Sequence, residues 1–255
     1  MKTWTTHIER WVLLIFLFAL PLQARIAFSS SWYFNEYVSF ALYVTDILLG
    51  ILFLLGLYNS SLKFSRPAAV SIVLCFFIGV AFISVFRASA ESVAWYRFAK
   101  LIEGIGLWIY MRNRAFEVLT GRQMLIAGFA GALFQAIIAI IQFLKQSDLG
   151  LQWLGESMLS ADLRGVASFY NSAHQKVIRA YGLMPHPNVL AAYFLAALTG
   201  WYLFFKYTAS RWYHYGGYVI TLFALFFTFS RTVILAWVAL LGWLLIRYRA
   251  QFKKT

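Results

Sequence analysis

The fold is decided by residues 123–144, QMLIAGFAGALFQAIIAIIQFL, a stretch without any charged residue. About 20 consecutive apolar residues suffice for an α-helix to cross the hydrocarbon core of a membrane, which is about 30 Å thick. Because lipid offers no hydrogen-bond partners, the backbone of such a segment must satisfy its own polar groups, and a helix does so. The stretch is therefore predicted to be a membrane-spanning helix.

Seven further apolar runs accompany this one along the chain. They lie at Trp11–Ala24, Val38–Tyr58, Ala68–Phe86, Ser92–Met111, Pro187–Phe205, Tyr213–Phe229 and Val233–Ile246. Only 12% of the 255 residues are charged, about half the fraction usual in water-soluble domains. The sequence therefore predicts an all-α integral membrane helical bundle of about eight transmembrane helices, forming a single domain over residues 1–255.

The formal net charge of +13 first suggests a nucleic-acid partner, but the distribution of the basic residues argues against one. Once the spans are drawn, most Lys and Arg residues fall in loops or tails on one side, where Glu9 and Glu117 are the only acidic residues. These basic residues are Lys2, Arg10, Lys63, Arg66, Arg112, Arg114, Arg122, Lys206, Arg211, Arg247, Arg249, Lys253 and Lys254. Cytoplasmic loops of membrane proteins carry such an excess, so both termini are expected in the cytoplasm.

Charged residues inside the predicted spans are costly and need partners. Asp46 is expected near the outer boundary, either as a helix cap or paired with an arginine such as Arg25. Arg97, Lys100 and Glu103 follow one another at helical spacing along one face. We expect Lys100 and Glu103 to neutralise each other. Arg97 either has a structural role or faces a polar cavity and binds a phosphate.

Within residues 123–144, small and amide side chains indicate close helix packing. Gly128 and Gly131 allow neighbouring backbones to approach, and Gln135 and Gln142 offer hydrogen bonds to other segments. The single cysteine, Cys75, lies in an apolar run and is expected to be a small buried side chain. No spacing of Cys or His suggests a metal site.

Residues 145–186 form the one long polar segment, predicted as a loop on the outer face between the fifth and sixth spans. Loops longer than about 15 residues are usually functional or disordered. Apolar residues at near-helical spacing, from Trp153 to Leu159, suggest a short helix lying on the membrane surface.

Two short motifs place arginines beside predicted helix starts. The first, Arg-Ala-Tyr-Gly-Leu-Met-Pro-His-Pro-Asn at 179–188, leads into an apolar run through Pro187, and proline suits the first turn of a helix. The second, Thr-Phe-Ser-Arg at 228–231, separates the last two apolar runs, which together are too long for one membrane-spanning helix. Free N–H groups and the helix dipole favour an anion at such positions.

In order, spacing and topology, the two motifs resemble those of the O-antigen ligase and polymerase superfamily, polytopic glycosyltransferases of the bacterial inner membrane. The resemblance implies a multi-pass protein that moves a glycan from a polyprenyl-pyrophosphate carrier to a sugar or lipid A-core acceptor at the periplasmic face. It also implies inverting displacement without a metal or another cofactor. The partners expected on this ground are the lipid-linked donor, the acceptor and membrane lipids, with no nucleic acid.

Carried over by motif, Arg179 and Arg231 bind the donor phosphates. Asn188, Ser230, Arg97 and Arg164 are the further candidates for substrate binding, and His186 and His174 are the candidates for the catalytic base. Simpler alternatives exist for several of them: Arg179 and Arg231 contact lipid headgroups, His186 caps the helix that begins at Pro187, Asn188 only starts that helix, and His174 is a solvated loop residue.

The chain departs from the family after the second motif, because it lacks the further spans and the larger outer loop that carry the histidine proposed as base. The second hypothesis is therefore a non-catalytic or truncated membrane subunit, which binds lipid-linked glycan or completes a partner membrane chain. A solute transporter is a third hypothesis, which would predict broken helices and internal symmetry.

Overall fold

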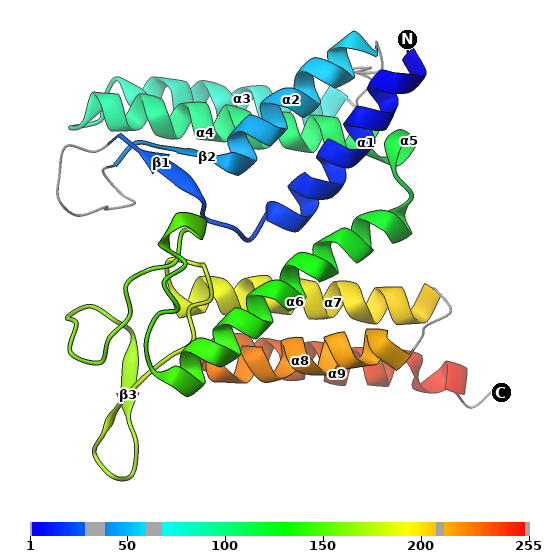
Figure 1. Ribbon diagram of the computed structural model, residues 1–255. Helices are drawn as coiled ribbons and strands as arrows, with labels where there is room; N and C mark the ends of the chain where they lie inside the picture. The colour runs from blue at the N-terminus through cyan, green and yellow to red at the C-terminus, as the bar shows by residue number, and fades with distance from the viewer. Residues whose placement is uncertain (1, 29–38, 60–67, 208–211, 253–255) are drawn as a thin grey trace. The chain divides into compact units, whose positions relative to one another are not determined.

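The computed structural model describes residues 2–28, 39–59, 68–207 and 212–252. The protein is mostly helical, as predicted (Figure 1). The α-helices are α1 (Lys2–Ala19), α2 (Val44–Tyr58), α3 (Ala68–Val85), α4 (Glu91–Tyr110), α5 (Phe116–Val118), α6 (Gly121–Lys145), α7 (Pro187–Tyr207), α8 (Trp212–Phe227) and α9 (Arg231–Phe252). A π-helical turn, Met111–Ala115, joins α4 to α5.

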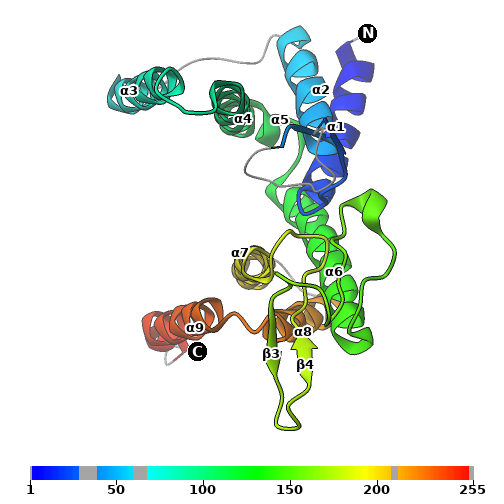
Figure 2. The ribbon, with the colours of Figure 1, turned by 90° about the vertical axis from the view of Figure 1, so that its left-hand side faces the viewer.

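Two antiparallel strand pairs accompany the helices, and the apolar patterning did not indicate them. β1 (Arg25–Ala27) pairs with β2 (Ala41–Tyr43). β3 (Ser168–Tyr170) pairs with β4 (Lys176–Ile178), and this hairpin extends away from the neighbouring helices in both ribbon views (Figures 1 and 2). The strands are three residues long, too short to show the period-2 alternation on which strand prediction relies.

The chain forms two compact units, which are described separately. Unit 1 contains residues 1–16 and 25–123, and unit 2 contains residues 17–24 and 124–255.

Unit 1 is held together by ion pairs between its helices. Glu9 of α1 is fully buried and accepts hydrogen bonds from Arg114 at 2.8 and 3.0 Å, from the hydroxyl of Tyr110 at 2.9 Å and from the side-chain amide of Asn59 at 2.8 Å. The hydrogen bonds that Arg114 donates to Glu9 raise the pKa of its guanidinium above the ordinary value. Burying a carboxylate costs free energy because its charge loses the solvation by water. The several hydrogen-bond donors around Glu9 offset this cost.

Asp46 and Lys100 form a further ion pair of unit 1, and of the two roles expected for Asp46 the structure shows the helix cap. The Asp46 carboxylate accepts the Tyr43 backbone N–H at 2.8 Å, which confirms its role as a helix cap. Its carboxylate also pairs with the ammonium of Lys100, a partner that the sequence did not indicate. Lys100 also pairs with Glu103 at 3.0 Å, as predicted. The i, i+3 spacing on α4 made that second contact predictable, whereas the first depends on how α2 and α4 pack.

Unit 2 is built from α6–α9 around an apolar core. The core contains Ala136 and Ala139 of α6, Leu190 and Phe194 of α7, and Leu225 of α8. Residues from the end of the loop, among them Met184, complete it. At the other end of α7, Trp201 stacks on Phe129 with ring centroids 3.8 Å apart. The loop segment just before α7 is therefore buried inside the bundle and does not lie over it.

The packing predictions for α6 hold for three residues of four. A Cβ atom at Gly131 would lie 2.5 Å from the carbonyl oxygen of Phe18, so this glycine does permit a close approach of two backbones. At Gly128 an added Cβ would meet nothing within 4 Å. Gln135 donates to the carbonyl of Pro21 at 2.7 Å and accepts the Leu183 N–H at 2.8 Å. Gln142 also hydrogen-bonds as expected, with partners given below with the site.

Among the described residues, two helices are long and apolar enough to cross a membrane, Gly121–Lys145 and Pro187–Phe205. Shorter apolar helices lie at Val44–Tyr58, Ile72–Val85 and Arg231–Leu244. A helix of 15 residues such as α2 measures about 22 Å, less than the hydrocarbon core. The helical fold is thus established, while the eight-span membrane bundle stays a prediction.

Several sequence-based boundaries shift in the structure. The first helix runs over Lys2–Ala19 where Trp11–Ala24 was expected, and α2 begins six residues late, at Val44, because β2 precedes it. Cys75 is exposed on α3 and not buried. The helix expected on the membrane surface is absent: between Trp153 and Leu159 only Trp153–Leu154 belong to a helical turn, the 3-10 turn Gln152–Leu154.

Candidate functional site

The two arginine motifs meet in unit 2, at the end where α6 and α8 finish and α7 and α9 begin (Figure 1). The backbone N–H of Ala180 donates to the carbonyl of Phe227 at 3.0 Å, which fixes the first motif against the end of α8. From there the half-buried Arg179 donates through Nε to the carbonyl of Thr228 at 2.6 Å. Residues 49 positions apart in sequence thereby come together in one site.

The second motif is a tight turn between α8 and α9. Thr228 is fully buried, and its hydroxyl donates to the carbonyl of Leu225 at 2.6 Å and accepts the Ser230 N–H at 3.3 Å. Phe229 has φ of +48°, a left-handed conformation that costs free energy in a residue other than glycine. The rings of Phe229 and Phe169 on β3 pack with their centroids 4.2 Å apart. This contact stabilises the strained turn.

Arg179 and Asn188 line a cavity of about 510 Å³ together with Phe229, Ser230, Arg231, Thr232 and Val233. Two arginines thus line the cavity, and no carboxylate is among its described lining residues. Arg231 is exposed at the first position of α9, where the backbone N–H groups have no partner within the helix. Guanidinium groups, a helix N-terminus and the absence of acidic groups together suit an anion, and phosphate oxygens in particular.

The electrostatics of Arg179 agree with this interpretation. Burial lowers the pKa of its guanidinium, because removal from water disfavours the charged form. Its recorded partners are both neutral: the Thr228 carbonyl and the Asn188 side-chain oxygen, which accepts from Nη2 at 2.6 Å. A partly buried cation of this kind gains more from a bound anion than an exposed one does.

His186 takes the capping role that was one of its two interpretations. Its Nδ1 accepts the backbone N–H of Asn188 at 3.1 Å, in the first turn of α7. The imidazole of His186 is exposed and is not among the residues that line the cavity. Asn188 lies in the first turn of α7 and its side-chain oxygen accepts a hydrogen bond from Arg179, whereas its role as a substrate ligand stays a prediction.

The other candidates from the sequence are not among the residues that line this cavity. His174 is exposed in the turn of the β3–β4 hairpin with φ of +58°, and Arg164 is exposed earlier in the loop. Arg97 belongs to unit 1, where it lines a cavity of about 300 Å³ with Ser84 and Phe98. Of the eight candidates, the structure therefore brings Arg179, Asn188, Ser230 and Arg231 into one cavity.

Sequence reasoning did not assign Glu156 a role, although it anchors the loop that carries the site. The buried carboxylate accepts hydrogen bonds from Gln142 at 2.7 Å and from the backbone N–H groups of Leu149 and Leu151 at 2.8 and 2.6 Å. Gln142 also bonds both the N–H and the carbonyl of Gly182, at 2.7 and 2.8 Å. A glutamine in an apolar helix was the one available signal for this anchor.

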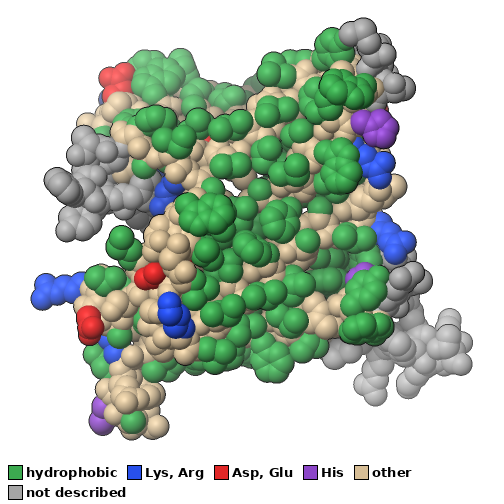
Figure 3. Space-filling model, viewed as in Figure 1, with side chains coloured by type: hydrophobic (Ala, Val, Ile, Leu, Met, Phe, Trp, Pro, Cys, Tyr) green, Lys and Arg blue, Asp and Glu red, His purple; other side chains and the backbone are tan. Residues whose placement is uncertain are grey.

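On the face that Figure 3 shows, hydrophobic side chains cover the helices of unit 2, whereas most charged side chains of this unit lie on the loop at the helix ends. Comparisons of the chain with protein-family models, with curated proteins and with solved structures found no match.

Proposed function

We propose that the apolar helices cross a bacterial inner membrane and that the cavity of Arg179 and Arg231 faces the periplasm. The exposed apolar surface of the helices supports this proposal. On α3, Ile72, Val73 and Phe76 are 67%, 68% and 73% exposed. Water-soluble proteins rarely expose contiguous apolar surface on this scale, whereas lipid would solvate it.

At this site we propose an O-antigen ligase-like glycosyl transfer, from a polyprenyl-pyrophosphate carrier to a sugar or lipid A-core acceptor. The observation that supports the proposal is the cavity itself, in which two arginines from separate motifs lie beside a helix N-terminus without a carboxylate. Such a site fits a pyrophosphate, whose charge grows as the bond to the sugar breaks.

Each residue of the cavity would have its own role in the proposed transfer. Arg179 is already oriented by Thr228 and Asn188, so little rearrangement is needed when the phosphate enters. Arg231 and the first N–H groups of α9 would stabilise the leaving pyrophosphate. Asn188 would position Arg179 through its side-chain oxygen. These groups bind and neutralise charge, which is most of what a pyrophosphate leaving group requires.

A second candidate function is a non-catalytic subunit that binds the lipid-linked glycan. It is favoured by the composition of the cavity, whose described lining residues include neither a carboxylate nor a histidine that would accept the proton of the acceptor hydroxyl.

Binding of a radiolabelled polyprenyl-pyrophosphate glycan to the purified protein tests both functions, with acceptor added to detect transfer. We expect Arg179→Ala and Arg231→Ala each to weaken binding about tenfold or more, since a hydrogen bond to a charged group contributes about 1.5 to 3 kcal/mol. Arg247→Ala is the matched control, because Arg247 lies on the same helix as Arg231 but about 24 Å along its axis. Unchanged binding by both cavity variants would refute the proposed site.

Transfer separates the two candidate functions. Binding with transfer would establish an enzyme, and His174→Ala and His186→Asn would then identify the base, since asparagine preserves the helix cap. Binding that depends on Arg231 but gives no transfer would establish the binding subunit.

A further inference from the structure

Unit 1 contains a charged cluster that the proposed glycosyl transfer does not use. Lys100 on α4 contacts the carboxylate of Asp46 on α2 and that of Glu103 one turn further along α4, the latter at 3.0 Å. The side chains are 27%, 13% and 28% exposed, respectively. Two carboxylates therefore share one ammonium group.

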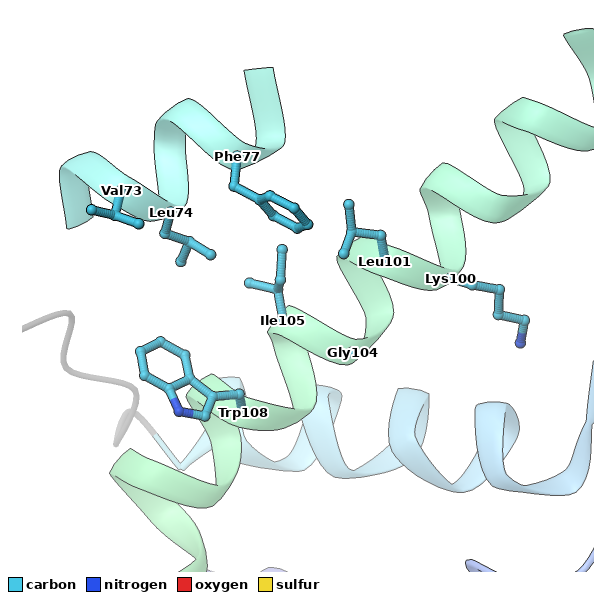
Figure 4. A pocket seen from close by; sticks show the side chains of 8 residues that line it. All are labelled: Val73, Leu74, Phe77, Lys100, Leu101, Gly104, Ile105 and Trp108. Carbon is cyan, nitrogen blue, oxygen red and sulfur yellow. The ribbon is translucent and has the colours of Figure 1, made fainter. Parts of the chain in front are cut away.

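The surroundings of this cluster are apolar. Asp46 and Glu103 line a cavity of about 510 Å³, whose other described lining residues are glycines and the apolar side chains of Leu49, Ile78 and their neighbours. A second apolar cavity, of about 720 Å³, lies between α3 and α4. Figure 4 shows the Lys100 side chain extending away from the hydrophobic residues of that second cavity, such as Phe77 and Trp108.

The other titratable groups described near the cluster are two tyrosines and two arginines. The rings of Tyr43 and Tyr96 lie 5.3 and 5.8 Å from the Lys100 ammonium, and tyrosine is neutral at ordinary pH. Arg25 stands opposite Tyr43 in the β1–β2 pair, and Arg97 follows Tyr96 with its guanidinium 5.7 Å from that ring. Among the described side chains of α3, Ile78 is the one that lines the cavity.

We propose that Asp46, Lys100 and Glu103 form a binding site for one exchangeable proton. With all three groups ionised, two negative charges face one positive charge among apolar residues, and an uncompensated charge in such surroundings is costly. One added proton makes the cluster neutral. The inference rests on the membrane part of the proposed function and does not depend on glycosyl transfer.

Hydrogen bonding decides which carboxylate takes the proton. Asp46 accepts both the Lys100 ammonium and the Tyr43 N–H, the latter at 2.8 Å, whereas Glu103 accepts only from Lys100 among the described residues. Donors stabilise the ionised form of a carboxylate. Glu103, with fewer of them, is therefore the group that binds the proton.

A metal ion fits this cluster less well than a proton does. Hard cations such as Ca²⁺ take six to eight oxygen ligands, and the two carboxylates supply about four at most. The Lys100 ammonium also occupies the position between the carboxylates where a cation would bind.

Dicyclohexylcarbodiimide, an apolar reagent that modifies protonated carboxyl groups, tests the proposal on the full-length protein in lipid vesicles. Mass spectrometry of the labelled peptides would locate the modified residue. We expect Glu103 to be labelled at low pH, and the labelling to fall about tenfold per pH unit above its midpoint, as a single titration requires. Glu117, which is 59% exposed and paired with Arg114, is the internal control and should stay unlabelled at neutral pH.

Two variants sharpen the test. Asp46→Asn removes the competing carboxylate, so Lys100 then neutralises Glu103 alone, and the midpoint of Glu103 labelling should fall by a pH unit or more. Glu103→Gln should abolish the label on this peptide.

Equal labelling of Glu103 and Glu117 at every pH would overturn the proposal, as would a midpoint unchanged by Asp46→Asn. Protection of Glu103 by sodium ions at fixed pH would show that the ligand is a metal ion. Because no donor glycan enters the experiment, its result is independent of the transfer assay.

Discussion

At the scale of single residues, Gly131 allows α6 to approach another backbone segment of unit 2 closely. We predict that Gly131→Ala lowers the free energy of unfolding by about 1 to 3 kcal/mol, because its Cβ would lie 2.5 Å from the Phe18 carbonyl oxygen, a backbone atom that cannot move aside alone. Gly128→Ala, on the same helix and with open space around it, should be neutral or slightly stabilising. Thermal unfolding in detergent compares the two variants, and equal midpoints would contradict the packing of α6 against residue 18.

A second prediction at this scale concerns pH. Burial raises the pKa of Tyr181 above its ordinary value of 10.0, and its hydroxyl oxygen accepts the Ala167 N–H at 2.6 Å. The unfolded chain therefore loses this proton first as the pH rises. The contribution of Tyr181 to stability is present below about pH 10 and is lost as the pH passes through the raised pKa.

We expect Tyr181→Phe to lower the unfolding midpoint near neutral pH, where the hydrogen bond to Ala167 is lost, and to reduce the further fall above about pH 10. Tyr170→Phe, at a ring that is 71% exposed, is the control. Thermal unfolding measured at a series of alkaline pH values checks the prediction, which fails if the two variants behave alike.

At the scale of elements, the loop between α6 and α7 is held by a buried carboxylate. We predict that Glu156→Ala frees residues 149–156, because two backbone N–H groups and the Gln142 amide lose their shared acceptor. Limited proteolysis should then cut this segment about tenfold faster, as expected for roughly 1.4 kcal/mol of lost protection. Asp162→Ala, at an exposed loop carboxylate, should leave the rate unchanged. Resistance of the Glu156 variant to protease would show that the loop is held by other contacts.

At the scale of the whole molecule, the proposed topology can be tested with cysteines. The single native cysteine allows a Cys75→Ala background, into which His174→Cys or Arg122→Cys is introduced. A membrane-impermeant maleimide should label position 174 in cells with a permeabilised outer membrane, and position 122 only after the inner membrane is opened. Labelling of both positions while the inner membrane is intact would place them on the same side. That result would contradict the single membrane crossing proposed between residues 122 and 174.

Much of the helical architecture could be predicted, because hydropathy and helix-start signals act over short distances in sequence. The boundaries of α3, α4, α6 and α7 lie within about two residues of those expected, and the break between α8 and α9 follows from length alone. The cap at His186 and the Lys100–Glu103 pair are likewise local. The short strands and the late start of α2 escaped prediction, because three-residue strands carry too little pattern.

The sequence by itself determined that the chain is helical and apolar, and that two arginine motifs stand at helix starts. Only the tertiary structure decided which distant groups meet: Arg179 with Thr228, Asp46 with Lys100, and Glu156 with Gln142. The physical reason is that a helix is specified by contacts three and four residues apart. The partner of a buried polar group, by contrast, is chosen by whichever neighbour the packing of other elements brings within hydrogen-bonding distance.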